Sequence, residues 1–224
     1  MSPATLTLAV LTLAAPPSPT LAVEPALAPV QSSLPRCPDA AKTCVGLVLH
    51  VVVKDGAPVQ TPAWLANQVA EANRHFATVG IGFSVVSVAS LPPELAEIHT
   101  KLDRDLGGRK LWTPKVIHVL VVESLDDVDT PGVPRLGVHW RDRAHRSHRW
   151  IYVTRVAIDW VLAHEIGHFF GLPHSRYPDS IMNKTPRLVP DPATWSFAAR
   201  EKPILKASLR LLLRSGQIEA IKRP

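Results

Sequence analysis

Residues 164–174 read His164-Glu165-Ile166-Gly167-His168-Phe169-Phe170-Gly171-Leu172-Pro173-His174, which is the pattern H-E-x-x-H-x-x-G-x-x-H. On a helix, His164 and His168 project from the same face, four residues apart, and can bind one metal ion. Glu165 stands beside the first histidine, Gly171 can end the helix with a positive φ, and His174 follows the turn. Three neutral histidines leave one position of a tetrahedral Zn²⁺ open, as a catalytic site requires.

The spacing makes this pattern specific. Five fixed residues, three of them scarce histidines, occur by chance in a chain of this length on the order of once in 10⁵. The alternative interpretation is an amphipathic helix with surface histidines and a glycine cap. The mechanics of zinc-peptidase motifs favour the metal site.

The long motif resembles that of the metzincin clan of zinc endopeptidases, in which a methionine turn follows the third histidine. Ser175 directly follows the third histidine, and Ser180-Ile181-Met182 comes after a short loop, which is most similar to the matrixin branch. The resemblance implies that Met182 forms an apolar floor under the zinc. It also implies that residues 183–192 form the wall of a specificity pocket. Some clan members have a tyrosine two residues after the methionine; here that residue is Lys184, so that role has no assigned residue.

The N-terminal half predicts a strand, a helix and a second strand. Residues 45–53 are a continuous apolar run rich in β-branched side chains, as in a buried strand, and Asp55-Gly56 marks a turn. Thr61 and Pro62 are typical of a helix start, and Gly80 ends the helix. Its apolar residues recur at spacings of four and three: Leu65, Val69, Ala72, Phe76 and Val79. Residues 81–89 predict the second strand, which implies a parallel pair with a right-handed crossover.

The remaining elements are shorter. A helix is predicted from the spacing of four apolar residues, closed by Gly107-Gly108: Leu95, Ile98, Leu102 and Leu106. Residues 116–122 and 150–154 predict strands, and residues 203–216 predict a final helix. The family resemblance implies that residues 137–140 are the short edge strand that lines the cleft. The active-site helix is expected to begin at about Arg155. The family resemblance implies an α+β, metzincin-like zincin domain: a twisted, mostly parallel sheet with an active-site helix, a methionine turn and a C-terminal helix.

The N-terminus has the composition of an export signal. Residues 6–15 are apolar, no charged residue precedes Glu24, and Ala26-Leu27-Ala28 is an A-x-A-like cleavage site, although the usual basic n-region is missing. We therefore expect a signal peptide over residues 1–28, a linker or short N-terminal segment over 29–44, and a catalytic domain over 45–224. The alternative for the first segment is a disordered tail rich in proline and alanine. No apolar run is long enough for a stable membrane anchor.

Cys37 and Cys44 are the only cysteines, and two interpretations of them are open. The first is a local disulfide at the start of the domain, as expected in an oxidising compartment. The second rests on the wording Pro35-Arg36-Cys37-Pro38-Asp39, which resembles a shortened form of the cysteine switch in matrixin propeptides. In that family the cysteine occupies the fourth zinc position and keeps the enzyme latent. The second cysteine nearby favours the disulfide.

Other polar clusters are weaker metal candidates. Asp126, Asp127 and Asp129 lack the spacing of a calcium loop, so a solvated turn is the favoured interpretation over Ca²⁺. Matrixins also carry a second, structural zinc. The residue types for such a site are present here without the family's spacing, in His139, Asp142, His145 and His148. A solvated basic loop is favoured over a second Zn²⁺ there. His118, within a predicted strand, is expected to be a packed or hydrogen-bonded core histidine.

Composition limits the partners. The chain has 224 residues, 46% of them hydrophobic, which suits one sizeable core. Its net charge of +6 comes from scattered residues, and no nucleic-acid motif accompanies them. We expect a protein or peptide substrate, no nucleic acid, and a monomer.

The sequence thus predicts a secreted or periplasmic zinc-dependent endopeptidase. Hydrolysis would proceed by Glu165-assisted attack of a zinc-bound water, with the three histidines as ligands and Glu165 as general base and then general acid. An extended substrate is expected to pair with the strand at residues 137–140. Two alternatives remain: a catalytically weak or inactive zinc-stabilised binding module of the same fold, and a chance motif in an exported adhesion protein without metal.

Overall fold

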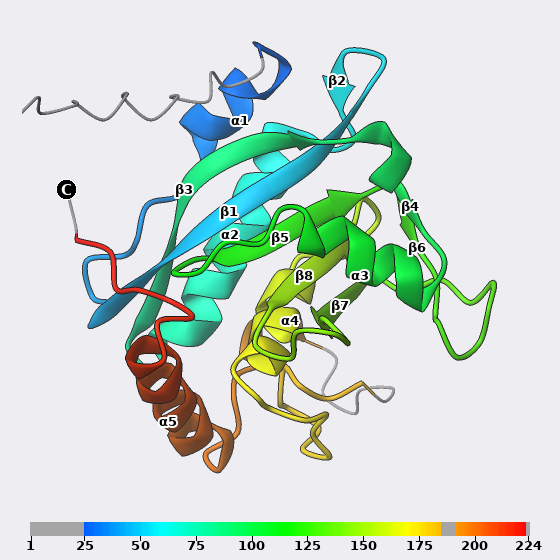
Figure 1. Ribbon diagram of the computed structural model, residues 1–224. Helices are drawn as coiled ribbons and strands as arrows, with labels where there is room; N and C mark the ends of the chain where they lie inside the picture. Colours follow the sequence, from blue (N-terminus) through cyan, green and yellow to red (C-terminus); the bar gives the residue numbers. More distant parts are fainter. Residues whose placement is uncertain (1–24, 185–190, 223–224) are drawn as a thin grey trace, which may run out of the picture.

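The computed structural model describes residues 25–184 and 191–222. Its centre is a twisted, mostly parallel sheet in the order β2-β1-β5-β8-β7, with β3 pairing with β1 (Figure 1). The strands of this sheet are β1 Thr43–Lys54, β2 Ala57–Pro58, β3 Ile81–Leu91, β5 Ile117–Val122, β7 Gly137–Arg141 and β8 Arg149–Thr154. The short strands β4 Glu97–Ile98 and β6 Ser124–Leu125 pair separately. The predicted α+β fold is confirmed.

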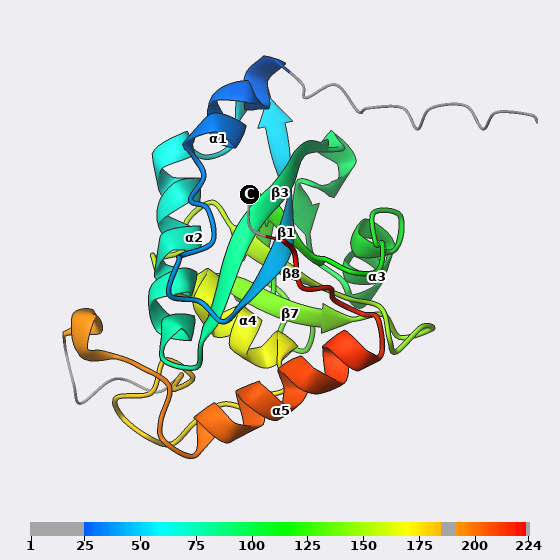
Figure 2. The same cartoon turned by 90° about the vertical axis from the view of Figure 1, so that its left-hand side faces the viewer.

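Helices cover both faces of the sheet. Figures 1 and 2 place α2 (Pro62–Ala77) and α4 (Val161–Phe169) on one face and α3 (Lys101–Arg109) on the other. Side chains alternate along each strand, so Ile151 and Val153 enter the core beneath α2 and α4, while Trp150 and Tyr152 enter a second core on the α3 side. One face of α5 (Glu201–Arg214) joins the first core through Leu205, Leu209 and Leu212.

The predicted strand–helix–strand unit is confirmed in detail. The parallel strands β1 and β3 pair from Thr43 opposite Ile81 onward, with α2 as the crossover. The Thr61 hydroxyl accepts a hydrogen bond from the Trp64 N–H and caps the helix. Gly80 has a φ of +76°, which allows the chain to turn directly into β3.

The region of the predicted helix over residues 95–106 differs from that prediction. The chain forms a 3₁₀ turn (Pro93–Leu95), then β4, and α3 begins only at Lys101, where Thr100 and Asp103 form a capping box. Leu102 is 56% exposed, so the leucine spacing does not mark the buried face. The buried face of α3 carries Gly107 and Gly108 instead, because the rings of Tyr152 and Trp150 on β8 press against it.

The active-site helix begins at Val161, not near Arg155 as the sequence suggested. The Arg155 N–H donates to the Val122 carbonyl and so continues the sheet. The next carbonyls are bound by α2: the Trp64 Nε1–H donates to Ala157 and the Gln68 amide donates to Ile158. Between β8 and α4 the backbone forms isolated turns instead of a helix, with the Ala157 N–H bonded to the Thr154 carbonyl and the Val161 N–H bonded to the Ile158 carbonyl.

The N-terminal segment also differs from the expected linker. Pro25–Leu27 forms a 3₁₀ turn and Ala28–Ser33 forms α1, which lies beside α2 (Figure 2). Leu27 and Val30 have no exposed surface and belong to the main core. Burial of two apolar side chains outweighs the turn preference of the surrounding prolines, so the folded domain includes part of the segment assigned to a leader.

The last helix runs over Glu201–Arg214 and is followed by Gly216 with a φ of +69°, close to the predicted bounds. A final 3₁₀ turn spans Pro192–Thr194. Residues 185–190, which include much of the expected specificity wall, lie outside the described residues, as do residues 1–24 of the expected signal peptide. None of the helices within the described ranges has the length and hydropathy needed to cross a bilayer.

Candidate active site

The helix α4 fixes two of the predicted ligands. Its first turn packs Val161 and Leu162 into the core, and Ile166 and Phe169 continue that buried face. This packing turns the opposite face of α4, which carries His164 and His168, towards an open cleft of ≈ 730 Å³. Because the helix is locked into the core, the imidazoles are held on a rigid element.

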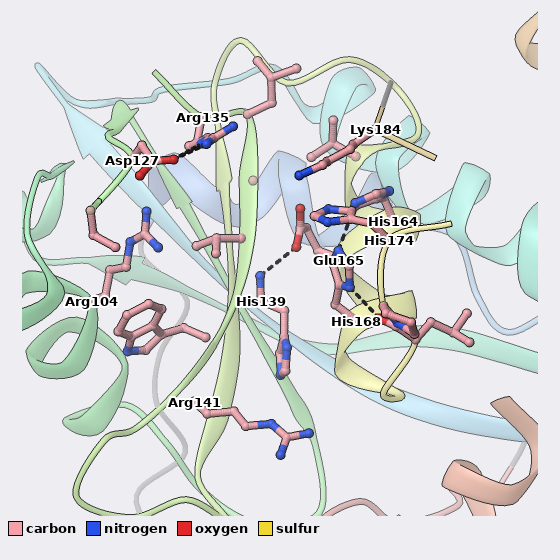
Figure 3. Close-up of a pocket in the computed structure, with 18 of the residues that line it drawn as sticks. Arg104, Asp127, Arg135, His139, Arg141, His164, Glu165, His168, His174 and Lys184 are labelled. Atoms are coloured by element: carbon pink, nitrogen blue, oxygen red, sulfur yellow. Dashed lines mark hydrogen bonds and ion pairs between the residues drawn. The ribbon is translucent and has the colours of Figure 1, made fainter. Parts of the chain in front are cut away.

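The third histidine comes from the turn after α4. Gly171 adopts a φ of +88°, which a residue with a Cβ resists, and the Leu172 N–H then bonds to the Gly167 carbonyl. This turn brings His174 back beside the helix. One nitrogen from each of His164, His168 and His174 lies within 4.8 Å of the others, so the three rings converge as predicted (Figure 3).

Backbone carbonyls orient the rings. His164 Nδ1 lies 2.8 Å from the Ile181 carbonyl oxygen, and His168 Nδ1 lies 2.6 Å from that of Leu172. A carbonyl oxygen only accepts, so each Nδ1 carries the proton and each Nε2 presents a lone pair. The two Nε2 atoms are 3.1 Å apart, a separation that suits two ligands of one ion.

The electrostatics suit neutral ligands. Burial lowers the pKa of His168. Burial, with a smaller effect of His168 and the nearby cations, lowers the pKa of His174 to about 4. Neutral imidazoles are the form that binds a divalent metal. The donor set, its tautomers and its charge therefore fit Zn²⁺.

Glu165 lies beside this cluster without joining it. Its side chain is buried, and its carboxylate accepts a hydrogen bond of 2.7 Å from the His139 N–H on β7. Burial raises the pKa of Glu165 to about 8, although the hydrogen bond from His139 opposes the shift. Gly137 allows this close approach, because a Cβ there would lie 3.0 Å from Glu165 Cγ and 2.7 Å from Val161 Cγ1. A carboxylate whose pKa is raised towards neutral pH can both accept and release a proton, as general acid–base chemistry requires.

Met182 lies under the cluster. It is fully buried, and it contacts α4 where Gly167 leaves room for its thioether. Two hydrogen bonds hold the turn: the Met182 N–H donates to the Ser180 side-chain Oγ, and the Ser175 N–H donates to the Met182 carbonyl. Ser180 in turn donates to the buried carboxylate of Glu201 at the start of α5. Met182 thus packs against the helix that carries His164 and His168.

The cleft follows the outer edge of β7. This strand is antiparallel to β8 and has no strand on its other side in the described sheet. The His139 N–H points toward Glu165, away from β8, so Gly137 and Arg141 also direct their backbone groups outward. Basic residues line the cleft on both sides of the strand: Arg104, Arg135, Arg141 and Lys184 (Figure 3).

The second-zinc candidates are brought together only in part. Asp142, His145 and His148 have ligand atoms within 4.8 Å of one another. The His139 side chain is not part of this group, and its ring packs edge-on against Phe169 of α4. Asp142 is fully buried, and both of its oxygens accept from Arg109 at 2.7 and 2.9 Å. Its charge is thereby balanced within the protein.

The calcium candidates form ion pairs instead. Asp127 pairs with Arg135, Asp126 pairs with His99, and Asp129 pairs with Lys101. Among the described residues, these aspartates do not form a group of the kind that could hold a cation. His118 is hydrogen-bonded within the core, as predicted, to His50 at 3.0 Å and to Thr113.

The two cysteines form a disulfide, Cys37–Cys44. Cys37 Sγ packs against the start of β3, where Gly82 leaves space for it. With both sulfurs bonded to each other, Cys37 has no thiolate to offer to a metal in this structure. The geometry supports the disulfide interpretation over the switch.

Arg104 is a cleft residue that sequence reasoning missed. It lies in the middle of α3, within a stretch that the sequence predicted only as a short helix, and no motif surrounds it. Its place in the cleft arises from the packing of α3 over the far end of β7, which the sequence pattern did not predict.

A helix with two metal-binding histidines, a glycine turn to the third, and a methionine beneath them define a zinc metallopeptidase of the metzincin type. The family model described as Matrixin matches residues 98–196, which span the cleft strand, the histidines and the methionine turn. This match confirms the resemblance to the metzincin clan and, within it, to the matrixin branch, over the part of the chain that carries the three histidines.

Two solved structures are similar at low identity. An archaemetzincin from Methanopyrus kandleri shares 15% identity over 77% of this chain and 98% of that protein, with a TM-score of 0.48. A zinc-dependent peptidase from Methanocorpusculum labreanum shares 18% identity over 71% of this chain and 98% of that protein, with a TM-score of 0.41. No curated protein matches the chain in sequence.

Proposed function

We propose that this chain is a secreted, zinc-dependent endopeptidase that cleaves extended protein segments. The observation that supports it most directly is the convergence of three imidazole nitrogens beside a buried carboxylate, in a cleft that runs along an open strand edge. A substrate that pairs along β7 can continue past either end of the strand, which favours internal cleavage over removal of end residues.

Each residue has a role in this proposal. His164, His168 and His174 hold Zn²⁺, which, when bound, polarises the scissile carbonyl and lowers the pKa of water. Glu165 takes a proton from the attacking water and passes it to the leaving nitrogen. The substrate pairs with the outward backbone groups of β7 and is held extended.

The disulfide and the N-terminal composition support export. Leu27 and Val30 are core residues, so loss of residues 1–28 would remove one of them from the folded domain. We therefore propose that any leader is cleaved before residue 25, and that the catalytic domain extends from there to the end of the chain.

The test is a single substitution with a matched control. Glu165→Gln removes the base and keeps the shape, so the purified variant should retain one zinc by mass spectrometry and cleave casein at least 10³-fold more slowly. Glu219→Gln changes an exposed carboxylate that pairs with Lys115 and should leave the rate unchanged. Equal rates in the two variants would refute the proposal. Zinc without casein cleavage in the wild type would instead indicate a binding module.

A further inference from the structure

A second wall of the cleft is formed by α3, on the opposite side of β7 from the histidines. Arg104 of this helix lines the cleft together with Asp127 and Arg135 (Figure 3). Arg135 and Asp127 form an ion pair with each other. Of these three charged side chains, only Arg104 makes no ion pair among the described residues.

Arg104 is a buried cation without a close counter-charge. The residue is 4% exposed, and within residues 25–184 and 191–222 it makes no ion pair and its Nε atom has no hydrogen-bond partner. Burial lowers the pKa of Arg104, and Asp127 and Asp129 oppose this from a longer distance. A guanidinium that has lost water without gaining a carboxylate is costly, and it gains most from an incoming anion.

The guanidinium is also held in place. One Nη donates to the Asp126 carbonyl, and the plane lies over the Trp140 ring with its carbon 5.0 Å from the ring centroid. Trp140 is fixed in turn, because its Nε1–H donates to Asp105 at 2.8 Å. An arginine that is already ordered loses little conformational entropy when it binds a ligand.

The strand edge explains how a substrate would reach it. Val138 and Trp140 point to the α3 side of the sheet, whereas His139 points to the α4 side. A peptide paired with β7 alternates its side chains in the same way. Those on one side meet the histidine cluster, and those on the other side meet Arg104.

We propose that Arg104 binds a carboxylate of the substrate, which makes the enzyme selective for acidic segments. This inference rests on the proposed peptidase function. A guanidinium fork matches the planar geometry of a carboxylate. Two sources supply it in a peptide: an Asp or Glu side chain, and the C-terminal carboxylate.

The test measures binding apart from cleavage. Metal-free, full-length protein is titrated with fluorescein-labelled peptides of one length. The reference peptides contain Gln and have an amidated C-terminus. A second set carries one Glu at each position in turn, and a third set is the Gln series with a free C-terminal carboxylate. We expect about tenfold tighter binding for at least one acidic position or for the free end, since one tenfold step is typical of a charge-assisted contact.

The variants decide the outcome. Arg104→Gln should reduce the carboxylate gain to less than about twofold, and Arg104→Lys, which keeps the charge without the fork, to about threefold. Arg155→Gln, which removes an arginine paired with Glu123, should keep the full gain. If Arg104→Gln does not fold, Arg104→Lys supplies the comparison. An equal gain in the wild type and the Arg104 variants, or no gain in the wild type, overturns the inference. Because no catalysis is involved, failure of the peptidase proposal would not produce either result.

Discussion

Gly167→Ala tests the contact between the active-site helix and the methionine turn. A Cβ at position 167 would stand 3.1 Å from Met182 Cε, closer still to Met182 Sδ, and 3.5 Å from Phe197 Cε1. Met182 has no exposed surface, so its thioether must withdraw by roughly 1 Å into a filled core to regain a normal contact distance. Replacing glycine by alanine inside a helix ordinarily stabilises it by about 1 kcal/mol.

The expected result has the opposite sign. Overpacking costs about 1–3 kcal/mol, so after the helix gain we expect the free energy of unfolding to fall by about 1 kcal/mol. Met182→Ala alone should cost about 2–4 kcal/mol by leaving a cavity. In the double variant the clash is absent and the new methyl group enters that cavity, so the two effects should fail to add by about 1–3 kcal/mol.

The assay is urea unfolding of the metal-free protein, followed by circular dichroism for the wild type, both single variants and the double variant. Excess chelator keeps zinc binding out of the comparison. Additive effects, or a Gly167→Ala variant as stable as the wild type, would show that the thioether does not pack against the helix as described.

Three further changes are expected to alter stability. Burial, with a contribution from His118, holds the pKa of His50 at about 4, below its value of 6.5 in the unfolded chain; stability should therefore fall as the pH drops from 6.5 to 4, by up to about 3 kcal/mol. His50→Gln, whose amide can still donate to His118, should flatten this part of the pH profile in urea titrations, and an unchanged slope would contradict the assignment. Cys37 and Cys44 are seven residues apart, so replacing both by serine should lower stability by about 2.5 kcal/mol, measured as a shift of the urea midpoint that a reductant reproduces in the wild type; no shift would count against the disulfide. Leu27→Ala should cost about 2–4 kcal/mol in thermal unfolding, whereas a change below about 0.5 kcal/mol would mean that the N-terminal segment is not part of the core.

The sequence predicted the parts of the molecule that local pattern determines. The fixed spacing of His164, His168 and His174 leaves few geometries other than convergence on one ion. The long apolar run of β1 and the capped, amphipathic α2 are similarly clear, because propensity, capping and hydrophobic period agree in each.

The parts that were missed depend on contacts between distant segments. The leucines near α3 suggested the wrong face, since the face that packs carries Gly107 and Gly108 under Tyr152 and Trp150. The place of Arg104 in the cleft follows from that same packing. Nothing close to either glycine in the sequence indicates which aromatic rings will press against them.

The N-terminal segment is a similar case. Its prolines and alanines suggested a linker, and only the space between α2 and β3 gives Leu27 and Val30 a reason to form a helix. Composition describes the average behaviour of a segment, whereas burial of one or two side chains decides its fold.

The bond between Glu165 and the His139 N–H has a consequence for how a peptide is aligned. The outward amide in the middle of β7 is already taken, so an incoming chain finds free amides only at Gly137 and Arg141, on either side of it. The peptide group opposite position 139 is then anchored through its neighbours and faces a carboxylate in place of a main-chain donor. The strand would thus leave the carbonyl opposite position 139 without a main-chain donor, which sets that bond apart from its neighbours along the cleft.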